Sequence, residues 1–413
     1  MNLTGLILAA SAAVALMLLQ WLAFIRKTSV IRNSWKHYGL YTIWKTLDRP
    51  KWFLVDLWPR QQPLICIADA DIAEQLTRAT QDALESTPKM TTPESLKILI
   101  GATSVSTAQC GSSTAFLWVW LVGGYSTPVG ETQVERLPEV HARIGSIIQQ
   151  DTKTGFAAKY IGSDTWTPSL FQQSIDQFKT LILAGQDTTA CALQWCFFYL
   201  WKHPAVLSEL RSEHDSVLGT DLAGVSSRLR DGPQLLQKLP YTTAVIKETL
   251  RLRGISGTTR EPAKDFCIDV DGEQVRLEAG AICYVNNFLL MKNPEYWGPD
   301  AEDFRPGRFL ESEADLISDE AGDGELHPHP KQRMRHIAYR PFERGPRNCI
   351  GQELSMLEMR VVLALTVRRF DFIKQGLDGV EDEEVYDISR VVHSPVDRMK
   401  MRFQERFGES SKS

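Results

Sequence analysis

One cysteine stands where a chain could hold a metal ion or a prosthetic group. Cys349 lies in the run F-E-R-G-P-R-N-C-I-G, residues Phe342–Gly351, between a loop rich in Gly and Pro and an apolar helix-forming run, Gln352–Phe370. A helix N-terminus favours an anion through its free N–H groups and its dipole, and the thiolate is the form of cysteine that binds metal. Arg347 adds a cation two residues away. The alternative is a buried cysteine after a turn.

A second polar motif, A-G-Q-D-T-T at Ala184–Thr189, lies inside the longest helical pattern of the chain. Gly185 in a helix interior costs about 1 kcal/mol relative to Ala, so it needs a packing or functional reason. Together with Ala184 it leaves room on one helix face for a flat group, beside the acid and alcohol of Asp187 and Thr188. The alternative is a polar patch in which Thr188 bonds to a carbonyl one turn earlier.

The cysteine loop resembles the haem-binding loop of the cytochromes P-450, F-x-x-G-x-R-x-C-x-G, with every defining position filled, including Phe342. The resemblance implies that Cys349 is the axial thiolate ligand of the iron of haem b, and that Arg347 pairs with a haem propionate. Arg260 stands nine residues after Arg251, where some members of this family place another propionate-binding arginine. A solvated Arg260 is the equal alternative.

The helical motif resembles the oxygen-binding groove of the same family, (A/G)-G-x-(D/E)-T. By that match, Ala184 and Gly185 form the haem-binding groove, Thr188 hydrogen-bonds bound dioxygen and Asp187 relays protons. Such a relay needs a positioned acid within hydrogen-bond reach, directly or through one water.

Two further motifs point to a structural cluster. Glu248 and Arg251, in E-T-L-R, are spaced i, i+3 and share a helix face, where an exposed pair would contribute little to stability. In the P-450 family this E-x-x-R motif joins an arginine of a later P-x-R-F loop, which here is Arg308 in P-G-R-F. The resemblance therefore implies a buried cluster that serves folding and haem retention.

Periodicity and turn signals predict the elements that position these motifs. Apolar patterns with caps and prolines at their ends predict helices at residues 70–78, 137–150, 167–202, 205–218 and 241–253. The 167–202 helix is apolar on most sides, which predicts that it is largely buried. Strands are expected at residues 64–68, in a hairpin over 266–277 with a type I′ turn at Asp271-Gly272, and in a third strand, Ala281–Asn286.

Composition limits the class of protein. The chain has 413 residues, 43% of them hydrophobic, and a formal net charge of −5, so no basic excess suggests nucleic acid. Its seven cysteines include no C-x-x-C pair, which fits a reducing compartment rather than a disulfide scaffold.

The N-terminus predicts a membrane anchor. Leu3–Ile25 carries no charge and exceeds the roughly 20 residues that span a bilayer. Arg26 and Lys27 follow it, which favours a retained anchor with the rest of the chain on the cytosolic side. The family resemblance implies a single-pass anchor in the endoplasmic reticulum membrane; a cleaved signal and a buried helix are the alternatives.

The middle of the chain departs from the family pattern. Residues 101–136 are atypical: Gly101–Thr114 is rich in Ser, Thr and Gly, and the apolar run Ala115–Tyr125 is too short to span a membrane. We find no helix there with the Trp and Arg that reach haem propionates in the family. The expected organisation is a membrane anchor at 1–27, a catalytic domain at 28–403 and a polar tail at 404–413. The fold class is mainly α with a small β portion, a P-450 fold incomplete in the middle.

The resemblance implies a haem-thiolate monooxygenase that inserts one oxygen atom from O2 into a lipophilic substrate, in fungal-type secondary metabolism. Electrons would come from NADPH through cytochrome P-450 reductase, with cytochrome b5 as an optional second donor. Basic residues at 331–336, close to the cysteine loop, would suit an acidic donor. One alternative is a truncated, non-catalytic membrane-anchored relative; another is a reductase-independent haem-thiolate isomerase or dehydratase.

Overall fold

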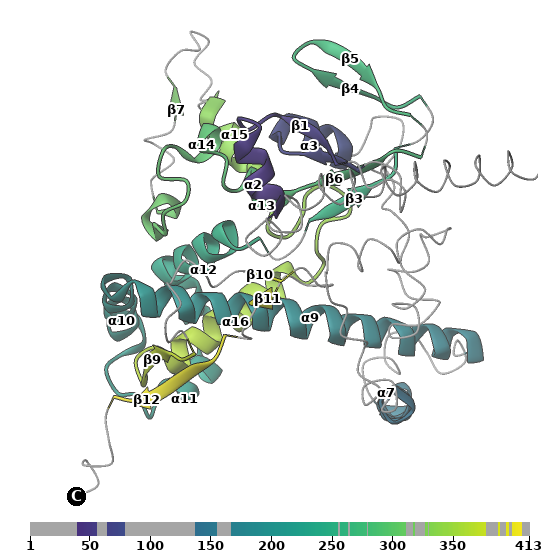
Figure 1. Cartoon of the computed structure of the whole chain (residues 1–413). Helices are drawn as coiled ribbons and strands as arrows, with labels where there is room; N and C mark the ends of the chain where they lie inside the picture. Colours follow the sequence, from purple (N-terminus) through teal and green to yellow (C-terminus); the bar gives the residue numbers. More distant parts are fainter. Residues whose placement is uncertain are drawn as a thin grey trace, which may run out of the picture.

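The computed structural model describes residues 39–55, 64–78, 137–154, 167–254, 257–262, 265–278, 280–310, 317–318, 327–328, 330–376, 387–388, 394–395 and 399–406. Within these residues a group of packed helices adjoins a part of the molecule that contains a four-stranded sheet (Figure 1). The expected class, mainly α with a small β portion, is confirmed for this part of the chain.

The long helix α9 (Pro168–Lys202) is the axis of the helical group (Figure 1). Thr167 caps it, because the Thr167 hydroxyl accepts a hydrogen bond from the Leu170 N–H at 3.1 Å and Pro168 takes the first turn. The helix ends at His203, since Pro204 begins the next one. The predicted span of 167–202 is therefore confirmed.

The C-terminal half of α9 forms the largest core of the described residues. Its buried aromatic side chains pack with residues of four other elements, namely α10 (Pro204–Leu218), α12 (Pro240–Leu252), α16 (Gln352–Thr366) and β9 (Phe370–Lys374). Strand β9 pairs antiparallel with β12 (Met401–Glu405). A smaller cluster joins α10 and α16 to two short helices, α11 (Val225–Asp231) and η4 (Pro233–Lys238).

The other half of α9 is less buried than its composition predicts. Helix α7 (Leu137–Thr154) packs against its first turns, where Ile175 is buried. Beyond that contact, Phe178, Leu181 and Ile182 are 45–55% exposed. The expectation of a helix buried along most of its length is therefore wrong for this stretch, because no described element covers it (Figure 1).

The four-stranded sheet has the order β1-β2-β6-β3. Its strands are β1 (Trp52–Val55), β2 (Leu64–Ile67), β6 (Ile282–Val285) and β3 (Thr258–Arg260). Helix α3 (Ala70–Thr77) follows β2 directly, and the Asp69 carboxylate caps it by accepting from the Ile72 N–H at 3.0 Å, as expected. Five further short helices surround this part: α2 (Gly39–Thr46), α13 (Asn287–Leu290), α14 (Pro294–Trp297), η5 (Pro306–Phe309) and α15 (Pro330–Ala338).

The predicted hairpin forms, but its predicted third strand lies elsewhere. Strands β4 (Cys267–Val270) and β5 (Glu273–Arg276) pair antiparallel, and Asp271 and Gly272 both have positive φ, 56° and 87°, as a type I′ turn requires. Strand β6 instead pairs parallel with β2 and antiparallel with β3. All four residues of β6 are buried, which suits a central strand covered on both faces rather than a hairpin edge.

Two very short strand pairs complete the described part, β7 (Ile317–Ser318) with β8 (His327–Pro328) and β10 (Asp387–Ile388) with β11 (Ser394–Pro395).

Among the described residues no helix has the length and hydropathy to cross a bilayer. The expected anchor at 1–27 and the atypical stretch 101–136 lie outside the described residues, as does most of the polar tail.

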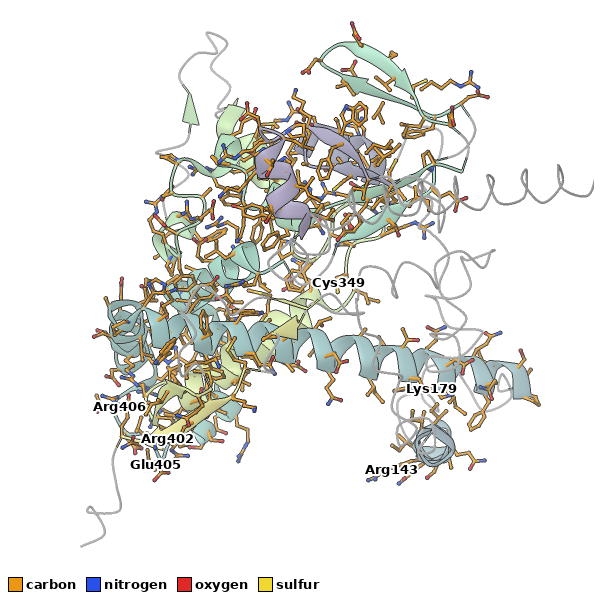
Figure 2. All side chains as sticks on the ribbon, in the orientation of Figure 1. Arg143, Lys179, Cys349, Arg402, Glu405 and Arg406 are labelled. Carbon is orange, nitrogen blue, oxygen red and sulfur yellow. The ribbon has the colours of Figure 1, made fainter. Side chains whose placement is uncertain are left out.

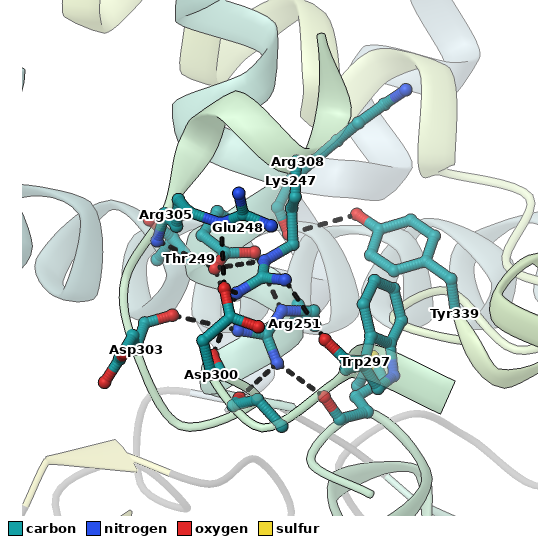
Figure 3. A network of polar contacts seen from close by, with 12 residues as sticks. Lys247, Glu248, Thr249, Arg251, Trp297, Asp300, Asp303, Arg305, Arg308 and Tyr339 are labelled. Carbon is teal, nitrogen blue, oxygen red and sulfur yellow. Dashed lines mark hydrogen bonds and ion pairs between the residues drawn. The ribbon is translucent and has the colours of Figure 1, made fainter. Parts of the chain in front are cut away.

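The expected charge cluster is fully buried (Figure 3). The Glu248 carboxylate accepts hydrogen bonds from Arg251 Nε at 2.7 Å and Nη2 at 2.8 Å, and from Arg308 Nε at 2.9 Å. Arg251 Nη1 donates to the carbonyls of Met291 and Ala301, at 2.8 and 2.6 Å. The exposed-pair alternative is thereby excluded, and the cluster joins α12 to η5 and to the segment between α13 and η5.

Loss of one partner from this cluster should destabilise the fold strongly, because the remaining buried charge cannot be hydrated. We expect Arg308→Met to lower the free energy of unfolding by about 3–5 kcal/mol, measured by urea denaturation. Arg276→Met is the matched control, since Arg276 pairs with Asp265 at the surface and its loss should cost about 0–1 kcal/mol. Equal effects of the two substitutions would contradict a cooperative buried cluster.

A second buried polar contact joins α10 to the N-terminus of α12. The Glu213 carboxylate accepts from the backbone N–H of Tyr241 and Thr242 at 2.6 and 2.9 Å, and from the Thr242 hydroxyl at 2.6 Å. The same hydroxyl lies 2.8 Å from Nε2 of the fully buried His214. Because that hydroxyl donates its proton to the carboxylate, His214 Nε2 must carry a proton and donate to the hydroxyl oxygen.

The buried His214 should make the fold sensitive to acid. Burial, reinforced by the nearby Arg368 cation, lowers the pKa of His214 to about 4. The unfolded chain takes up this proton below about pH 6.5, whereas the folded protein resists it until about pH 4. Stability is thus lost as the pH falls through this window, by about 2 kcal/mol at about pH 5. Urea denaturation should show a smaller loss between about pH 7 and about pH 5 for His214→Gln; an unchanged loss would contradict this assignment.

Candidate functional site

The cysteine loop leads directly into α16. The Cys349 N–H donates to the Phe342 carbonyl at 2.8 Å, which closes the loop, and the Phe342 side chain packs against the core around α9. Helix α16 then starts at Gln352, and its N-cap, Gly351, has no side chain to satisfy the first N–H groups. The loop therefore presents Cys349 immediately before a helix N-terminus, as predicted.

Cys349 differs from most other described cysteines in its exposure. Four of the six are buried, and burial raises the pKa of the Cys196 and Cys283 thiols to about 12. Such thiols stay protonated and unavailable to a metal. Cys349 and Cys267 are exposed, but Cys267 lies on the hairpin strand β4, where its thiol donates to the Asp265 carbonyl at 3.7 Å. The buried-cysteine alternative is therefore excluded for Cys349, which Figure 2 labels between the sheet-containing part and α9.

The loop is held tightly against α3. Gly345 has φ +80°, and a Cβ added there would lie 2.0 Å from the Thr77 carbonyl oxygen. Only glycine combines this backbone conformation with such a close approach. The last turn of α3 therefore packs directly against the cysteine loop and helps to fix its position.

The Ala184–Thr189 motif leaves an open stretch of helix surface on α9, which we call the α9 groove. A Cβ added at Gly185 would meet no heavy atom within 4 Å, so glycine is not required there by packing within the described chain. Ala184 and Asp187 are exposed, and the half-exposed Thr188 donates its hydroxyl to the Ala184 carbonyl at 2.7 Å. This is the backbone bond that the sequence offered as the alternative. It leaves the hydroxyl oxygen able to accept a hydrogen bond from a group in the groove.

A contact that the sequence motifs did not identify joins α9 to α16, the helix that follows the cysteine loop. Thr189 is buried, and its hydroxyl donates to the Ser355 hydroxyl at 3.1 Å. Ser355 lies in the first turn of α16, six residues after Cys349, and its N–H donates to the Gly351 carbonyl at 2.8 Å. The residue beside Thr188 is therefore bonded to the helix that Cys349 precedes. No pattern in the sequence shows that the hydroxyls of Thr189 and Ser355 are in contact, so this pair could not be predicted from the sequence.

Arg260 is fully buried, which excludes the solvated alternative. Its Nη1 donates to the Thr258 hydroxyl, and its Nη2 lies 4.0 Å from a Glu343 carboxylate oxygen. Neither Nε nor Nη2 has a hydrogen-bond partner within the described part of the chain. Burial lowers the pKa of Arg260 to about 10, with Arg347 and Arg340 acting in the same direction, but the group remains cationic at neutral pH.

Sequence reasoning missed a further set of charged groups beside the loop. Arg340 is fully buried; its guanidinium donates to Glu74 at 3.2 Å, to Glu343 at 3.0 Å and to the Thr77 hydroxyl. Arg344 Nε also donates to Glu74, at 3.4 Å. The available signal was the repetition of arginine at 340, 344 and 347, with Glu343 between them.

The net charge and the unpaired N–H donors beside the cysteine loop fit a haem with two propionates. The arginine network, defined here as Arg260, Arg340, Arg344 and Arg347 with Glu74 and Glu343, carries two more positive than negative charges. Buried N–H groups of Arg260, Arg340 and Arg347 make no hydrogen bond to the described residues. Two propionates would neutralise the excess charge and accept from these donors. Ile350, next to Cys349, is 92% exposed and offers apolar surface to a porphyrin.

Comparison with known proteins identifies the family that this site resembles. A model of the cytochrome P-450 family, described as "Cytochrome P450", matches residues 172–399, which is more than half of the chain. The match includes most of α9 with the Ala184–Thr189 motif, the buried Glu248 cluster and the cysteine loop.

Curated relatives agree with the family match. The chain is 40% identical over 202 residues to the cytochrome P-450 monooxygenase acrF of Aspergillus aculeatus, which covers 49% of this chain and 41% of that protein. It is 37% identical over 196 residues to polC of Polytolypa hystricis, also a cytochrome P-450 monooxygenase, covering 47% of this chain and 32% of that protein. The matches thus span less than half of these two relatives.

One relative is matched over most of its length. The chain is 34% identical over 184 residues to the cytochrome P-450 monooxygenase PC-23 of Penicillium crustosum, covering 43% of this chain and 79% of that protein.

The close contact between the cysteine loop and α3 can be tested without any ligand. Gly345→Ala places a methyl group against the Thr77 carbonyl in a left-handed conformation, so we expect the free energy of unfolding to fall by at least about 2 kcal/mol. Gly307→Ala is the control, because a Cβ there meets nothing within 4 Å and should change stability by less than about 0.5 kcal/mol. Urea denaturation of both variants measures the difference; equal stabilities would contradict the predicted clash.

Proposed function

The chain belongs to the cytochrome P-450 family, and on that premise we propose that it is a haem-thiolate monooxygenase. In the proposed reaction the enzyme inserts one oxygen atom of O2 into a lipophilic organic substrate. The observation that carries it is the bond between Thr189 and Ser355, which joins the α9 groove to the helix behind the exposed Cys349. Neither motif alone could enclose a flat prosthetic group.

Cys349 would hold the haem iron as a thiolate, because it is exposed and precedes the N-terminus of α16. Ala184 and Gly185 would leave room for the opposite face, and Arg260 and Arg347 would bind the propionates. Phe342 would support the loop through its packing and its carbonyl. When bound, the haem supplies activation of dioxygen, favoured by the electron-rich thiolate.

Thr188 and Asp187 would manage protons in the groove. While the Thr188 hydroxyl donates to the Ala184 carbonyl, its oxygen can accept a hydrogen bond from a group placed over Gly185. Asp187 is exposed on the adjoining position of α9, so its carboxylate is in contact with solvent. An acid in contact with solvent and an alcohol in the groove are the two parts that a proton relay needs.

The proposed redox partners, pathway and membrane anchor rest on what is typical of the family and not on a contact in the structure. Electrons would come from NADPH through a cytochrome P-450 reductase, with cytochrome b5 as an optional second donor. Helix α15 carries Arg333, Arg335 and His336 shortly before the cysteine loop and would suit an acidic partner. The exposed apolar side chains Phe178 and Leu181, on the groove side of α9, favour a lipophilic substrate. A fungal pathway of secondary metabolism and an endoplasmic reticulum anchor complete the proposal.

The test is the carbon monoxide difference spectrum of the reduced, haem-loaded full chain. We expect the absorbance typical of a thiolate-ligated haem, and its loss in Cys349→Ala because no other described cysteine lies in this loop. Cys267→Ala, which alters the other exposed described cysteine, should keep the spectrum. A wild-type spectrum retained by Cys349→Ala would overturn the ligand assignment.

A second candidate is a non-catalytic member of the family. It is favoured by the exposed stretch of α9, where Phe178, Leu181 and Ile182 lack a covering element within the described residues. Folded, purified protein with a haem-to-protein ratio near zero would support it against the monooxygenase. Product formation without NADPH would instead point to an isomerase or dehydratase.

A further inference from the structure

Glu343 lies at the centre of the arginine network. Its Oε1 accepts from Arg340 Nη2 at 3.0 Å and from the Arg344 backbone N–H at 3.3 Å, while its Oε2 lies 4.0 Å from Arg260 Nη2. The Glu343 side chain is only 10% exposed. The Glu343 carboxylate therefore lies next to two arginines from separate parts of the chain: Arg260, on strand β3, and Arg340, which precedes the cysteine loop.

The backbone at Glu343 is unusual for a residue with a long side chain. Its φ is +65°, in the left-handed region that glycine, asparagine and aspartate adopt more readily. Such a conformation persists when surrounding bonds over-determine it. Two hydrogen bonds supply that constraint. The Glu343 N–H donates to the Arg340 carbonyl, and the Glu343 carboxylate accepts from the Arg344 N–H.

Arg340 extends the contact to a third element. It donates to Glu74 and to the Thr77 hydroxyl, both on α3, from a fully buried position. Glu343 is thus bonded to a cation that joins α3 to the approach to the cysteine loop, and it also lies beside Arg260 on β3. Displacement of its carboxylate would remove one partner from each of the two guanidinium groups, which would keep their contacts to Thr258, Glu74 and Thr77.

We propose that Glu343 is the positioning residue of the porphyrin carboxylates: it holds Arg260 and Arg340 in place and leaves their unpaired N–H groups for the propionates. The role rests on the proposed haem site, and it acts through the two arginines rather than by contact with the haem. Neither the cysteine-loop motif nor the E-x-x-R cluster assigns it.

The charges explain why a carboxylate is needed at this position. Three guanidinium groups, from Arg260, Arg340 and Arg347, lie close enough to influence one another, and the neighbouring arginines lower the pKa of Arg260 whereas Glu343 raises it. Without Glu343, mutual repulsion would separate the guanidinium groups before any haem arrives. With it, the arginine network retains only the positive charge that two propionates neutralise.

The experiment uses Glu343→Gln in the haem-loaded full chain, which removes the charge and keeps the shape. Transfer of haem to excess apomyoglobin should be about 10- to 100-fold faster than in the wild type, the effect typical of losing an outer partner of a ligand. The midpoint potential should shift to a more positive value, because loss of a nearby negative charge favours the ferrous form. Glu273→Gln, an exposed change on β5, should leave both quantities unchanged.

Two further variants separate positioning from folding. Glu343→Asp keeps the charge and suits positive φ, so it should restore the wild-type potential and slow haem transfer relative to Glu343→Gln. If Glu343→Gln does not fold, Glu74→Gln, which removes the second carboxylate bound to Arg340, should also accelerate haem transfer.

The outcomes are distinct. A wild-type rate in Glu343→Gln, or in Glu74→Gln where that variant replaces it, would overturn the inference. Faster transfer with an unchanged potential in Glu343→Gln would assign Glu343 to loop stability alone and would also overturn it. A wild-type chain that binds no haem would instead refute the proposed function.

Discussion

The buried Glu248 carboxylate is the constraint on which the described structure depends. It is shared between Arg251 and Arg308, and Arg251 also donates to the carbonyls of Met291 and Ala301. A charge taken out of water is tolerated only when each of its partners is in place, so α12, η5 and the segment between them must assemble together. This requirement makes the cluster a junction between α12 and the segment that runs from α13 to η5 (Figure 3).

The approach to the cysteine loop begins at the same junction. Tyr339 packs beside Trp297 and donates its hydroxyl to the Lys247 carbonyl at 3.3 Å, next to Glu248. The following residue is Arg340, which joins α3 and Glu343. The chain therefore passes from one buried charge cluster directly into another, and the loop that carries Cys349 leaves from the second. Position of the loop and stability of the fold are consequently coupled.

The two clusters differ in one physical respect. Around Glu248, each buried arginine N–H of Arg251 and Arg308 finds an acceptor in the protein. Around Glu343, the Nε atoms of Arg260, Arg340 and Arg347 and the Nη2 atom of Arg260 find no acceptor among the described residues. In the proposed haem site, these unpaired donors and the excess positive charge are what the two propionates would bind.

Local chemistry made several features predictable. The Asp69 cap, the Asp271-Gly272 turn and the Pro168 start of α9 follow from bonds within a few residues, and the structure confirms them. The parallel pairing of β6 with β2 was not predicted, because the partner strand lies more than 200 residues away and leaves no local pattern. The burial of α9 was overestimated because composition records how apolar a helix is, but not which neighbours cover it.

Local patterns were enough to predict the residue types of the site: a cysteine before a helix, a glycine in a helix interior and the arginines that flank them. How these residues are buried and paired follows from the folded arrangement. Arg260 is buried rather than solvated, Thr189 bonds Ser355 across two helices, and Glu343 lies between arginines of separate elements. Short-range patterns encode caps, turns and motifs. Burial and charge pairing depend on distant segments, so they exist only once the chain has folded.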